Sequence, residues 1–403
     1  MMNTEEIINS EQEYMLQTYA RLPLAIVRGE GCTVYDPEGN AYLDGVAGIA
    51  VNLLGYHYQP VIDAVCEQAG ELIHASNLYY TVPQVELAKK LVNRSGFSKV
   101  FFNNSGAEAN EVALKMARFY GRRKYGNRYK FISLSRSFHG RTFMTLAVTA
   151  QEKFHHDLEP LASGVRYADL NDLASLCQVL DDEVCGIIVE PVQGEGGVYP
   201  AEKEFLEAVR ALCDEKDLIL IFDEVQCGMG RTGRFFAFET YGVKPDVITL
   251  AKGLGGGFPI GAIIVGEKIV SITKKGDQGS TFGGNPVCAK AAGVMVDAVS
   301  QPELLAMVRE RGEYLKKELH LLRQEFPGVV TDFRGLGLMW GIDIPGKAKK
   351  CVELMLHQGI LVNAANDDTI RLLPPLIIKE SELALIMNGF RKVLPALKMP
   401  GIG

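Results

Sequence analysis

Lys252 has an unusual setting for a lysine, because it lies between two apolar runs and directly before a glycine-rich turn. Residues 247–251 precede it and residues 260–265 follow the turn, and both runs are predicted to be buried strands. Apolar surroundings disfavour the ammonium form, so the amine can act as a nucleophile on a carbonyl. An exposed lysine on a loop is the commoner arrangement, but these flanks favour a buried nucleophile.

A second group, Asp223, ends the apolar run 218–222 and is followed three residues later by Gln226. In α/β folds ligands bind at the carboxyl ends of the strands, and a carboxylate buried there needs a partner. A protonated ring nitrogen would be one partner, and a helix cap or a core ion pair would be another. Gln226 could donate a hydrogen bond to a ring oxygen.

Two segments carry groups suited to a phosphate. Ser105, Gly106 and Ala107 precede a predicted helix, where backbone amides and the helix dipole attract anions. Ser105 and Glu108 also have the spacing of a capping box, and the segment alone favours neither interpretation. Residues 279–286 add the hydroxyls of Ser280 and Thr281 among glycines.

Other side chains could hold a substrate. In the segment 135–142, Phe138 or His139 could stack on an aromatic ring, and Arg141 offers a planar fork to a carboxylate; a surface ion pair is the alternative for Arg141. Glu195 lies in a glycine-rich loop. Arg371 lies within an apolar run, where a buried guanidinium requires an anionic partner.

These groups can form one site only if the fold brings the ends of several strands together, and the hydrophobic pattern predicts such a fold. Helices are predicted at 108–124 and 202–216, and an alternation of apolar strands with helices indicates a parallel sheet covered on both faces. The predicted strands are 99–102, 130–134, 184–189, 218–222, 247–250 and 261–265.

Both ends of the chain have a different pattern. Residues 3–20 are predicted to form a polar helix or arm, and 33–44 a hairpin with its turn at 37–40. Beyond residue 300 the predicted elements are a helix at 302–325, a strand within 337–344, a helix at 348–358, a short strand near 360, a strand at 370–378 and a helix at 380–398. We therefore expect a large domain over 60–298 and a small α+β domain built from 1–59 and 299–403.

Composition narrows the class of protein. The net charge of −7 argues against a nucleic-acid partner, and no apolar run approaches the length of a membrane span. The acidic, polar N-terminus does not resemble a signal peptide. Eight cysteines without a Cys-x-x-Cys pair, and histidines without a His-Glu-x-x-His motif, favour reduced thiols in the cytoplasm and no metal site.

Four motifs occur in a fixed order: Ser105-Gly-Ala-Glu-Ala-Asn110, Phe138-His-Gly-Arg-Thr142, Phe222-Asp-Glu-Val-Gln226 and Ala251-Lys-Gly-Leu254. In this order the chain resembles the class III, fold-type-I pyridoxal-phosphate aminotransferases from about Arg28 to the C-terminus. The resemblance implies fold type I, with a mostly parallel seven-stranded sheet in a large domain and a smaller α+β domain.

The resemblance also implies a role for each matching residue. Lys252 would form the Schiff base with pyridoxal 5'-phosphate, and Asp223 would pair with the pyridinium nitrogen. Phe138 would stack on the ring, Gln226 would contact its 3-oxygen, and Glu224 and Val225 would adjoin the cofactor. The phosphate would be bound by Ser105, Gly106 and Ala107, with Thr281 arriving from the second subunit of a homodimer. Arg141, Glu195, Ser280 and Arg371 would bind substrate.

Within the family, residues 77–80 and 101–117 resemble most closely the members that act on N2-acetylornithine. This implies small-molecule substrates, namely N2-acetylornithine, 2-oxoglutarate and the product glutamate, in arginine biosynthesis. One departure is Gly55-Tyr-His-Tyr-Gln-Pro60, where many relatives have Gly-His-x-His-Pro.

Three other functions stay open at this point. Aminotransferases that act on ornithine or 4-aminobutyrate have the same machinery. A related aminomutase would need no external keto acid. A non-catalytic binding module is the third, although Lys252 and Asp223 argue against it.

Overall fold

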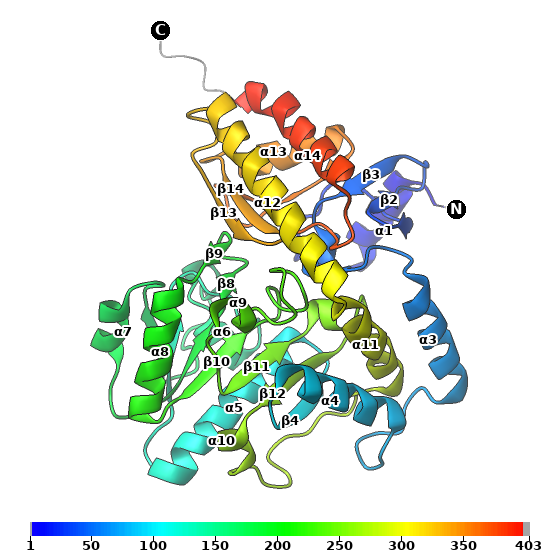
Figure 1. Ribbon diagram of the computed structural model, residues 1–403. Helices are drawn as coiled ribbons and strands as arrows, with labels where there is room; N and C mark the ends of the chain where they lie inside the picture. Colours follow the sequence, from blue (N-terminus) through cyan, green and yellow to red (C-terminus); the bar gives the residue numbers. More distant parts are fainter. Residues whose placement is uncertain (1, 398–403) are drawn as a thin grey trace.

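A seven-stranded sheet forms the centre of the protein, whose computed structural model describes residues 2–397 (Figure 1). Its strand β12 runs antiparallel to both neighbours, and the remaining pairs are parallel. The prediction of a mostly parallel sheet is confirmed. In spatial order the strands are β4 (Lys99–Asn103), β12 (Gly261–Val265), β11 (Val247–Leu250), β10 (Ile219–Asp223), β7 (Val184–Val189), β5 (Lys130–Leu134) and β6 (Val165–Ala168).

All six predicted strands of this sheet are present, with bounds that differ by at most one residue. The sequence analysis missed β6, at the edge of the sheet. It has four residues, and only Ala168 is buried, so it lacks the continuous apolar run that marks the central strands.

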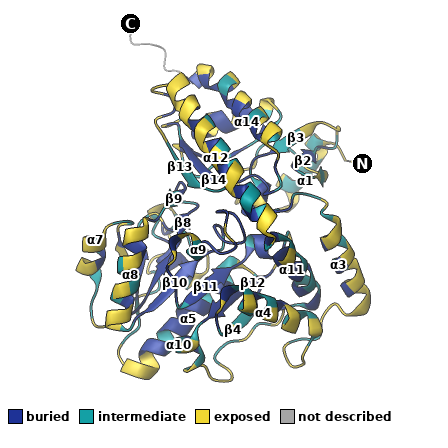
Figure 2. Ribbon diagram, in the orientation of Figure 1, coloured by how far each residue is buried: buried dark blue, intermediate teal, exposed yellow. Residues whose placement is uncertain are grey.

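The sheet separates two apolar layers because side chains alternate along each strand. In β10, Ile219 and Ile221 pack with α5 (Gly106–Tyr125) on one face. Leu220 and Phe222 pack with α8 (Lys203–Lys216) on the other. Exposed residues lie on the outer sides of the covering helices, and the strands between them are buried (Figure 2).

Further helices complete these layers, and one long helix leads away from the sheet. The helices around the central sheet are α3 (Gln59–Glu71), α4 (Val82–Ser95), α6 (Phe143–Val148), α7 (Leu173–Val179), α9 (Phe238–Tyr241), α10 (Glu267–Val270) and α11 (Pro286–Val299). The helix α12 (Pro302–Glu325) follows α11 and runs up to the second part of the molecule (Figure 1).

Two four-stranded sheets lie in the upper part of Figure 1. The predicted hairpin at 33–44 is confirmed, because β2 pairs antiparallel with β3. One sheet has the order β1 (Arg28–Glu30), β2 (Thr33–Tyr35), β3 (Ala41–Asp44), β15 (Ile360–Leu361), and the other has the order β13 (Asp332–Leu336), β14 (Met339–Asp343), β17 (Thr369–Leu372), β16 (Asn363–Ala364). A two-stranded pair joins β8 (Val192–Gln193) to β9 (Tyr199–Pro200).

In the C-terminal region, the helices match their predictions more closely than the strands β13 and β17 do. The helices α12, α13 (Ala348–His357) and α14 (Glu380–Val393) all lie where they were expected. The strand β13 was not predicted, and β17 ends at Leu372 rather than near 378 because Pro374 and Pro375 cannot donate ladder hydrogen bonds. The last predicted helix continues as a 3-10 turn, Leu394–Leu397, and residue 398 lies outside the described residues.

The N-terminal segment contains a backbone feature that sequence patterns did not predict. The first helix, α1 (Thr4–Tyr14), is exposed. The short element α2 (Ala47–Ala50) has positive φ at all four residues, so it is a left-handed turn. The carboxylate of Asp44 fixes its start by accepting hydrogen bonds from the amides of Val46 and Ala47. This left-handed turn leads directly into the wall of the site described below.

The predicted division into a domain over 60–298 and a domain built from 1–59 and 299–403 stays a prediction. Among the described residues, no single helix is long and apolar enough to cross a membrane; α11 and α12 pass that test only when joined, and they meet at 68°.

Candidate active site

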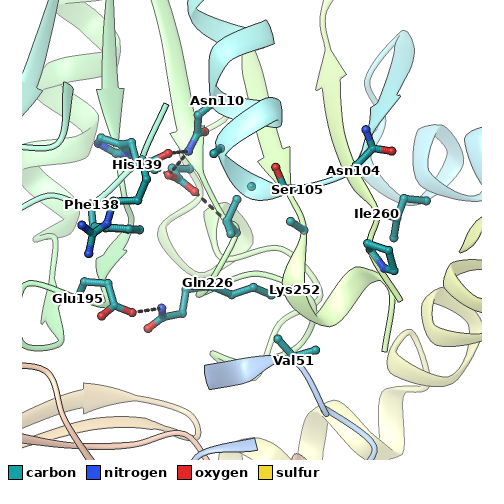
Figure 3. A pocket seen from close by; sticks show the side chains of 18 of the residues that line it. Val51, Asn104, Ser105, Asn110, Phe138, His139, Glu195, Gln226, Lys252 and Ile260 are labelled. Carbon is teal, nitrogen blue, oxygen red and sulfur yellow. Dashed lines mark hydrogen bonds and ion pairs between the residues drawn. The ribbon is translucent and has the colours of Figure 1, made fainter. Parts of the chain in front are cut away.

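A cavity of about 460 Å³ lies at the edge of the central sheet where β4, β5, β7, β10 and β11 end (Figure 3). Parallel strands direct their carboxyl ends to one edge, so residues far apart in sequence meet there. Ten of the residues predicted for the site line this cavity: Ser105, Gly106, Ala107, Phe138, Arg141, Glu195, Asp223, Val225, Gln226 and Lys252.

Four other predicted site residues do not line the cavity. Glu224 points away from it and accepts hydrogen bonds from the amides of Ala237 and Phe238. Burial raises the pKa of Glu224 to about 8. Arg371 lies behind the wall, while Thr281 is exposed in a separate small cavity. Ser280 contacts the site indirectly, because Nδ2 of the wall residue Asn104 donates to its hydroxyl over 3.2 Å.

Lys252 projects into the cavity from the short turn that follows β11 (Figure 3). Its own φ is 43°, a left-handed value, and Gly256 and Gly257 also have positive φ. Desolvation by burial lowers the pKa of the Lys252 amine, although the nearby carboxylate of Glu195 acts in the opposite direction. The side chain is half-buried and the direction of this shift agrees with the expected weakening of the ammonium form, while the role of Lys252 as a nucleophile stays a prediction.

Asp223 is buried at the end of β10, and four groups fix its carboxylate. Oδ2 lies 2.7 Å from the Asn110 amide nitrogen, which donates to it, and 2.8 Å from Nδ1 of His139. Oδ1 accepts from the amide of Val225 over 3.0 Å and from the Thr249 hydroxyl over 3.4 Å. The carboxylate is therefore held in one orientation by neighbours from one strand, one helix and two loops.

The end of the cavity that is suited to a phosphate is formed by the start of α5. Ser105 is the N-cap and accepts a hydrogen bond from the amide of Glu108 over 3.2 Å. The predicted capping box is only half present, because the Glu108 carboxylate accepts from the backbone and side chain of Asn104 instead of from the Ser105 amide. A Cβ on Gly106 would lie 2.8 Å from Cγ1 of Val225, so only glycine fits against that residue.

Arg141 lies at the exposed side of the cavity, near two aromatic rings. Its guanidinium carbon is 3.8 Å from the centroid of Phe154 and 5.7 Å from that of Phe138. Among the described residues it makes no ion pair, so its guanidinium is free to bind a carboxylate. Phe138 packs edge-on against Phe154 and is half-buried.

At the end of the cavity opposite Ser105, Glu195 is the anionic partner that a buried Arg371 was expected to need. Oε1 of Glu195 lies 2.6 Å from Nη1 of Arg371, and Nε2 of Gln226 donates to the same oxygen over 3.1 Å. Burial acts to raise the pKa of Glu195, but Arg371 and Lys252 outweigh it and lower the pKa to about 2. Gln226 also accepts from Arg371 over 3.0 Å, so its side chain is engaged with this pair.

Three wall residues have roles that the sequence analysis did not identify. Asn110 and His139 hold Asp223, as described above. Glu190 follows β7 directly, and its carboxylate accepts from the amides of Phe138 and Gly194. Burial raises the pKa of Glu190 to about 7, and the nearby charge of Asp223 adds to the effect. Its place at a strand end was the signal that could have identified Glu190.

The wall fits a phosphorylated pyridine aldehyde. Backbone amides at the start of α5 suit a phosphate, Asp223 offers a fixed carboxylate for a ring nitrogen, and Lys252 offers an amine for an aldehyde. In addition, Nε2 of His139 is buried without a hydrogen-bond partner among the described residues. Together with the mostly parallel sheet, these features define a pyridoxal-phosphate-dependent enzyme of fold type I.

Comparison with known proteins gives the family. The sequence model for Aminotransferase class-III matches residues 14–394. The chain is 48% identical over 394 residues to the acetylornithine aminotransferase of Caldanaerobacter subterraneus subsp. tengcongensis, covering 97% of this chain and 100% of that one. It is 46% identical over 398 residues to that of Methanocaldococcus jannaschii, covering 98% and 100%. The crystal structure of ornithine aminotransferase from Toxoplasma gondii superposes with a TM-score of 0.94 at 28% identity, covering 98% and 96%. The chain belongs to the class III aminotransferases, and it is a pyridoxal-phosphate-dependent transaminase of small-molecule substrates.

Proposed function

We propose that this enzyme transfers the terminal amino group of N2-acetyl-L-ornithine to 2-oxoglutarate, a step of arginine biosynthesis. The observation that carries this proposal is the Glu195–Arg371 ion pair at the end of the cavity opposite Ser105. An N-acetylated donor presents one carboxylate and a neutral amide, so it leaves the pair intact. The relatives of 46% and 48% identity that are named acetylornithine aminotransferase support the same substrate.

The same pair suggests how one cavity accepts two unlike substrates. Arg141, free of ion pairs among the described residues, would hold the α-carboxylate of either substrate. Glutamate brings a second carboxylate, which needs a second cation, and Arg371 is that cation. The side chain of Glu195 is half-buried, and it would swing aside to release Arg371 for glutamate. This switch lets a single site distinguish a neutral amide from a carboxylate.

Lys252 and Asp223 would carry the chemistry. When bound, pyridoxal 5'-phosphate supplies an aldehyde that takes up the amino group and a ring that accepts electrons. The Lys252 amine, with its lowered pKa, would remove the proton from the substrate carbon and return it during transfer. The Asp223 carboxylate would hold a proton on the ring nitrogen, and the amides of Gly106 and Ala107 would bind the phosphate.

We also propose that the active form is a homodimer with shared sites, in the cytoplasm. Leu78 and Tyr80 lie in the segment that lines the small cavity of Thr281, and they are 85% and 99% exposed, which is unusual for large side chains with apolar surface. Phe282 is also exposed and adjoins Thr281, which would then reach the phosphate of the partner subunit. All eight cysteines are free thiols, as expected in a reducing compartment.

Two measurements test these proposals. With 2-oxoglutarate as acceptor, kcat/KM should be higher for N2-acetylornithine than for N2-succinylornithine, ornithine or 4-aminobutyrate. A higher kcat/KM for ornithine or 4-aminobutyrate would contradict the proposal that N2-acetylornithine is the amino donor. Phe282→Ser should favour monomers in sedimentation and weaken cofactor retention, whereas Leu321→Ser, an exposed change on α12, should not. A fully active monomer would rule out shared sites.

A further inference from the structure

The helix α12 passes the strand β13 (Figure 1). A second cavity, away from Lys252, lies between these two elements. It encloses about 620 Å³, more than the 460 Å³ of the lysine cavity, and the two walls share no residue. Its wall comes from α12, from the hairpin of β13 and β14, and from the loop around residues 232–234. We call it the α12–β13 cavity.

The charged groups of this wall are mostly cations. Arg234, Arg309, Lys316 and Arg334 line it, against the single acid Glu313. Three of these five lie on α12 at i, i+4 and i+7, so they share one face of that helix. The chain as a whole has seven more acidic than basic residues, so four cations around one cavity are a local departure from its composition.

Most of these cations are not held in ion pairs. Arg334 pairs with Asp343, with Nη1 2.7 Å from Oδ2. Within residues 2–397, Arg234, Arg309 and Lys316 make no ion pair. The one hydrogen bond from Arg309 goes to the backbone oxygen of Gly233 over 2.6 Å. Uncompensated cations in a concave wall create a positive potential that attracts anions.

The wall is built by close packing rather than by a chance gap between side chains. A Cβ on Gly312 of α12 would lie 2.6 Å from the backbone oxygen of Gly337, so the hairpin turn rests directly on the helix. Gly337 itself has a φ of 57°.

We propose that the α12–β13 cavity binds a small polyanion that carries two or more carboxylate or phosphate groups. Guanidinium groups bind both kinds of oxyanion through paired hydrogen bonds, and a single charge would leave two of the three free cations unmatched. The volume falls within the range of about 300–1,000 Å³ that is typical of pockets for small organic ligands.

The variants for a test follow from the contacts. Arg334 also donates to the backbone oxygen of Gly197, next to the loop of Glu195, so changing it would disturb the active site. Arg234 and Lys316 are exposed and make no such contact, so the double variant Arg234→Gln/Lys316→Gln should fold normally. Lys317→Gln is the matched control, because Lys317 is an exposed neighbour on α12 outside the cavity wall.

The experiment is equilibrium dialysis of the holoenzyme against radiolabelled pyrophosphate and, separately, citrate, at constant ionic strength. We expect saturable binding of at least one of them, weakened about tenfold or more in the double variant and unchanged in Lys317→Gln. Binding of pyrophosphate alone identifies a phosphorylated ligand, and binding of citrate alone a polycarboxylate. Absence of saturable binding for both anions, or equal affinity in the wild type and the double variant, would overturn the proposal.

Discussion

The two ends of the lysine cavity hold their carboxylates in different ways. Asp223 is buried at a strand end and accepts four hydrogen bonds, three of them from groups that are distant in sequence. Glu195 is half-buried in a turn that contains Gly194, Gly196 and Gly197, and its contacts are Arg371 and Gln226. One carboxylate is fixed by the scaffold, and the other is held by side chains that it can leave.

This difference matches two tasks. A group that serves the cofactor does the same work in both halves of a transamination, so a fixed orientation favours it. A group that serves the substrate meets a neutral amide in one half-reaction and a carboxylate in the other, so it must change partners. We call the surroundings of Asp223 the fixed end and the surroundings of Glu195 and Arg371 the adjustable end. The following predictions separate the two, starting with the largest expected effect.

Lys252→Ala should remove nearly all turnover with every substrate, by about a thousandfold or more, because the proton-transferring amine is lost. Borohydride treatment of the wild-type holoenzyme should attach the cofactor to Lys252, as peptide mass spectrometry can show. Lys203→Ala, an exposed change on α8, is the control and should behave like the wild type. A label on another lysine would remove the basis for this role.

Asp223→Asn should lower kcat in both half-reactions by about 10²–10⁴-fold, because the amide cannot keep a proton on the ring nitrogen. The cofactor should remain bound, as its absorption band reports, since the phosphate contacts are unchanged. Equal losses for acetylornithine and glutamate are expected from a fixed group. A near-normal kcat, or a change in KM alone, would indicate a binding role instead.

Changes at the adjustable end should instead separate the two half-reactions. Arg371→Ala should slow the glutamate half-reaction more than the acetylornithine one, by about 2–5 kcal/mol. Glu195→Gln leaves Arg371 free, so it should favour glutamate over acetylornithine. Single-turnover rates measure both effects, and Glu202→Gln is an exposed control. Because the pKa of Glu195 is about 2, the asymmetry should not vary with pH near neutrality. Equal effects on both half-reactions would contradict the switch.

The smallest expected effect concerns Glu190, which connects the two ends by accepting from the amides of Phe138 and Gly194. Its pKa is raised by burial from 4.5 to about 7 in the folded protein. Between pH 4.5 and about 7, Glu190 keeps its proton in the folded state but has lost it in the unfolded state. The free energy of unfolding therefore falls as pH rises from 4.5 towards 7.

Glu190→Gln cannot ionise, so its stability relative to the wild type should improve over the same interval. Denaturant unfolding at a series of pH values measures this difference, and Glu204→Gln, an exposed change, should show none. A wild-type-to-variant difference that does not depend on pH would show that Glu190 is already ionised in the folded protein.

The sequence predicted the central sheet well because its strands are buried on both faces. Strands such as β7 and β11 are continuous apolar runs, and their bounds were predicted correctly. Two strands that were not predicted, β6 and β13, are only partly buried, so their composition resembles that of a loop. The buried strand β8 has only two residues, which is too short to show a pattern. Sequence patterns therefore detect burial more reliably than strand pairing.

The same limit explains what was missed in the site. Lys252 and Asp223 stood out because a charged residue beside an apolar run requires a reason. Asn110 and His139 did not, because their importance comes from meeting Asp223 across the fold. Glu224 follows Asp223 in sequence but faces away from the cavity, since consecutive residues of a strand end point in opposite directions. Such contacts depend on the three-dimensional arrangement, which spacing alone does not encode.

The left-handed turn at Ala47–Ala50 has a consequence for engineering this enzyme. Val51, the next residue, lines the lysine cavity, so the turn sets the position of one wall. Left-handed backbone disfavours every residue with a Cβ by about 1–2 kcal/mol, yet three of the four residues here are not glycine. In a mutant library over these positions, glycine and asparagine should be enriched for backbone reasons before any substrate is offered. In selections for activity on new amino donors, the residues enriched at these positions will therefore reflect the left-handed backbone more than substrate specificity.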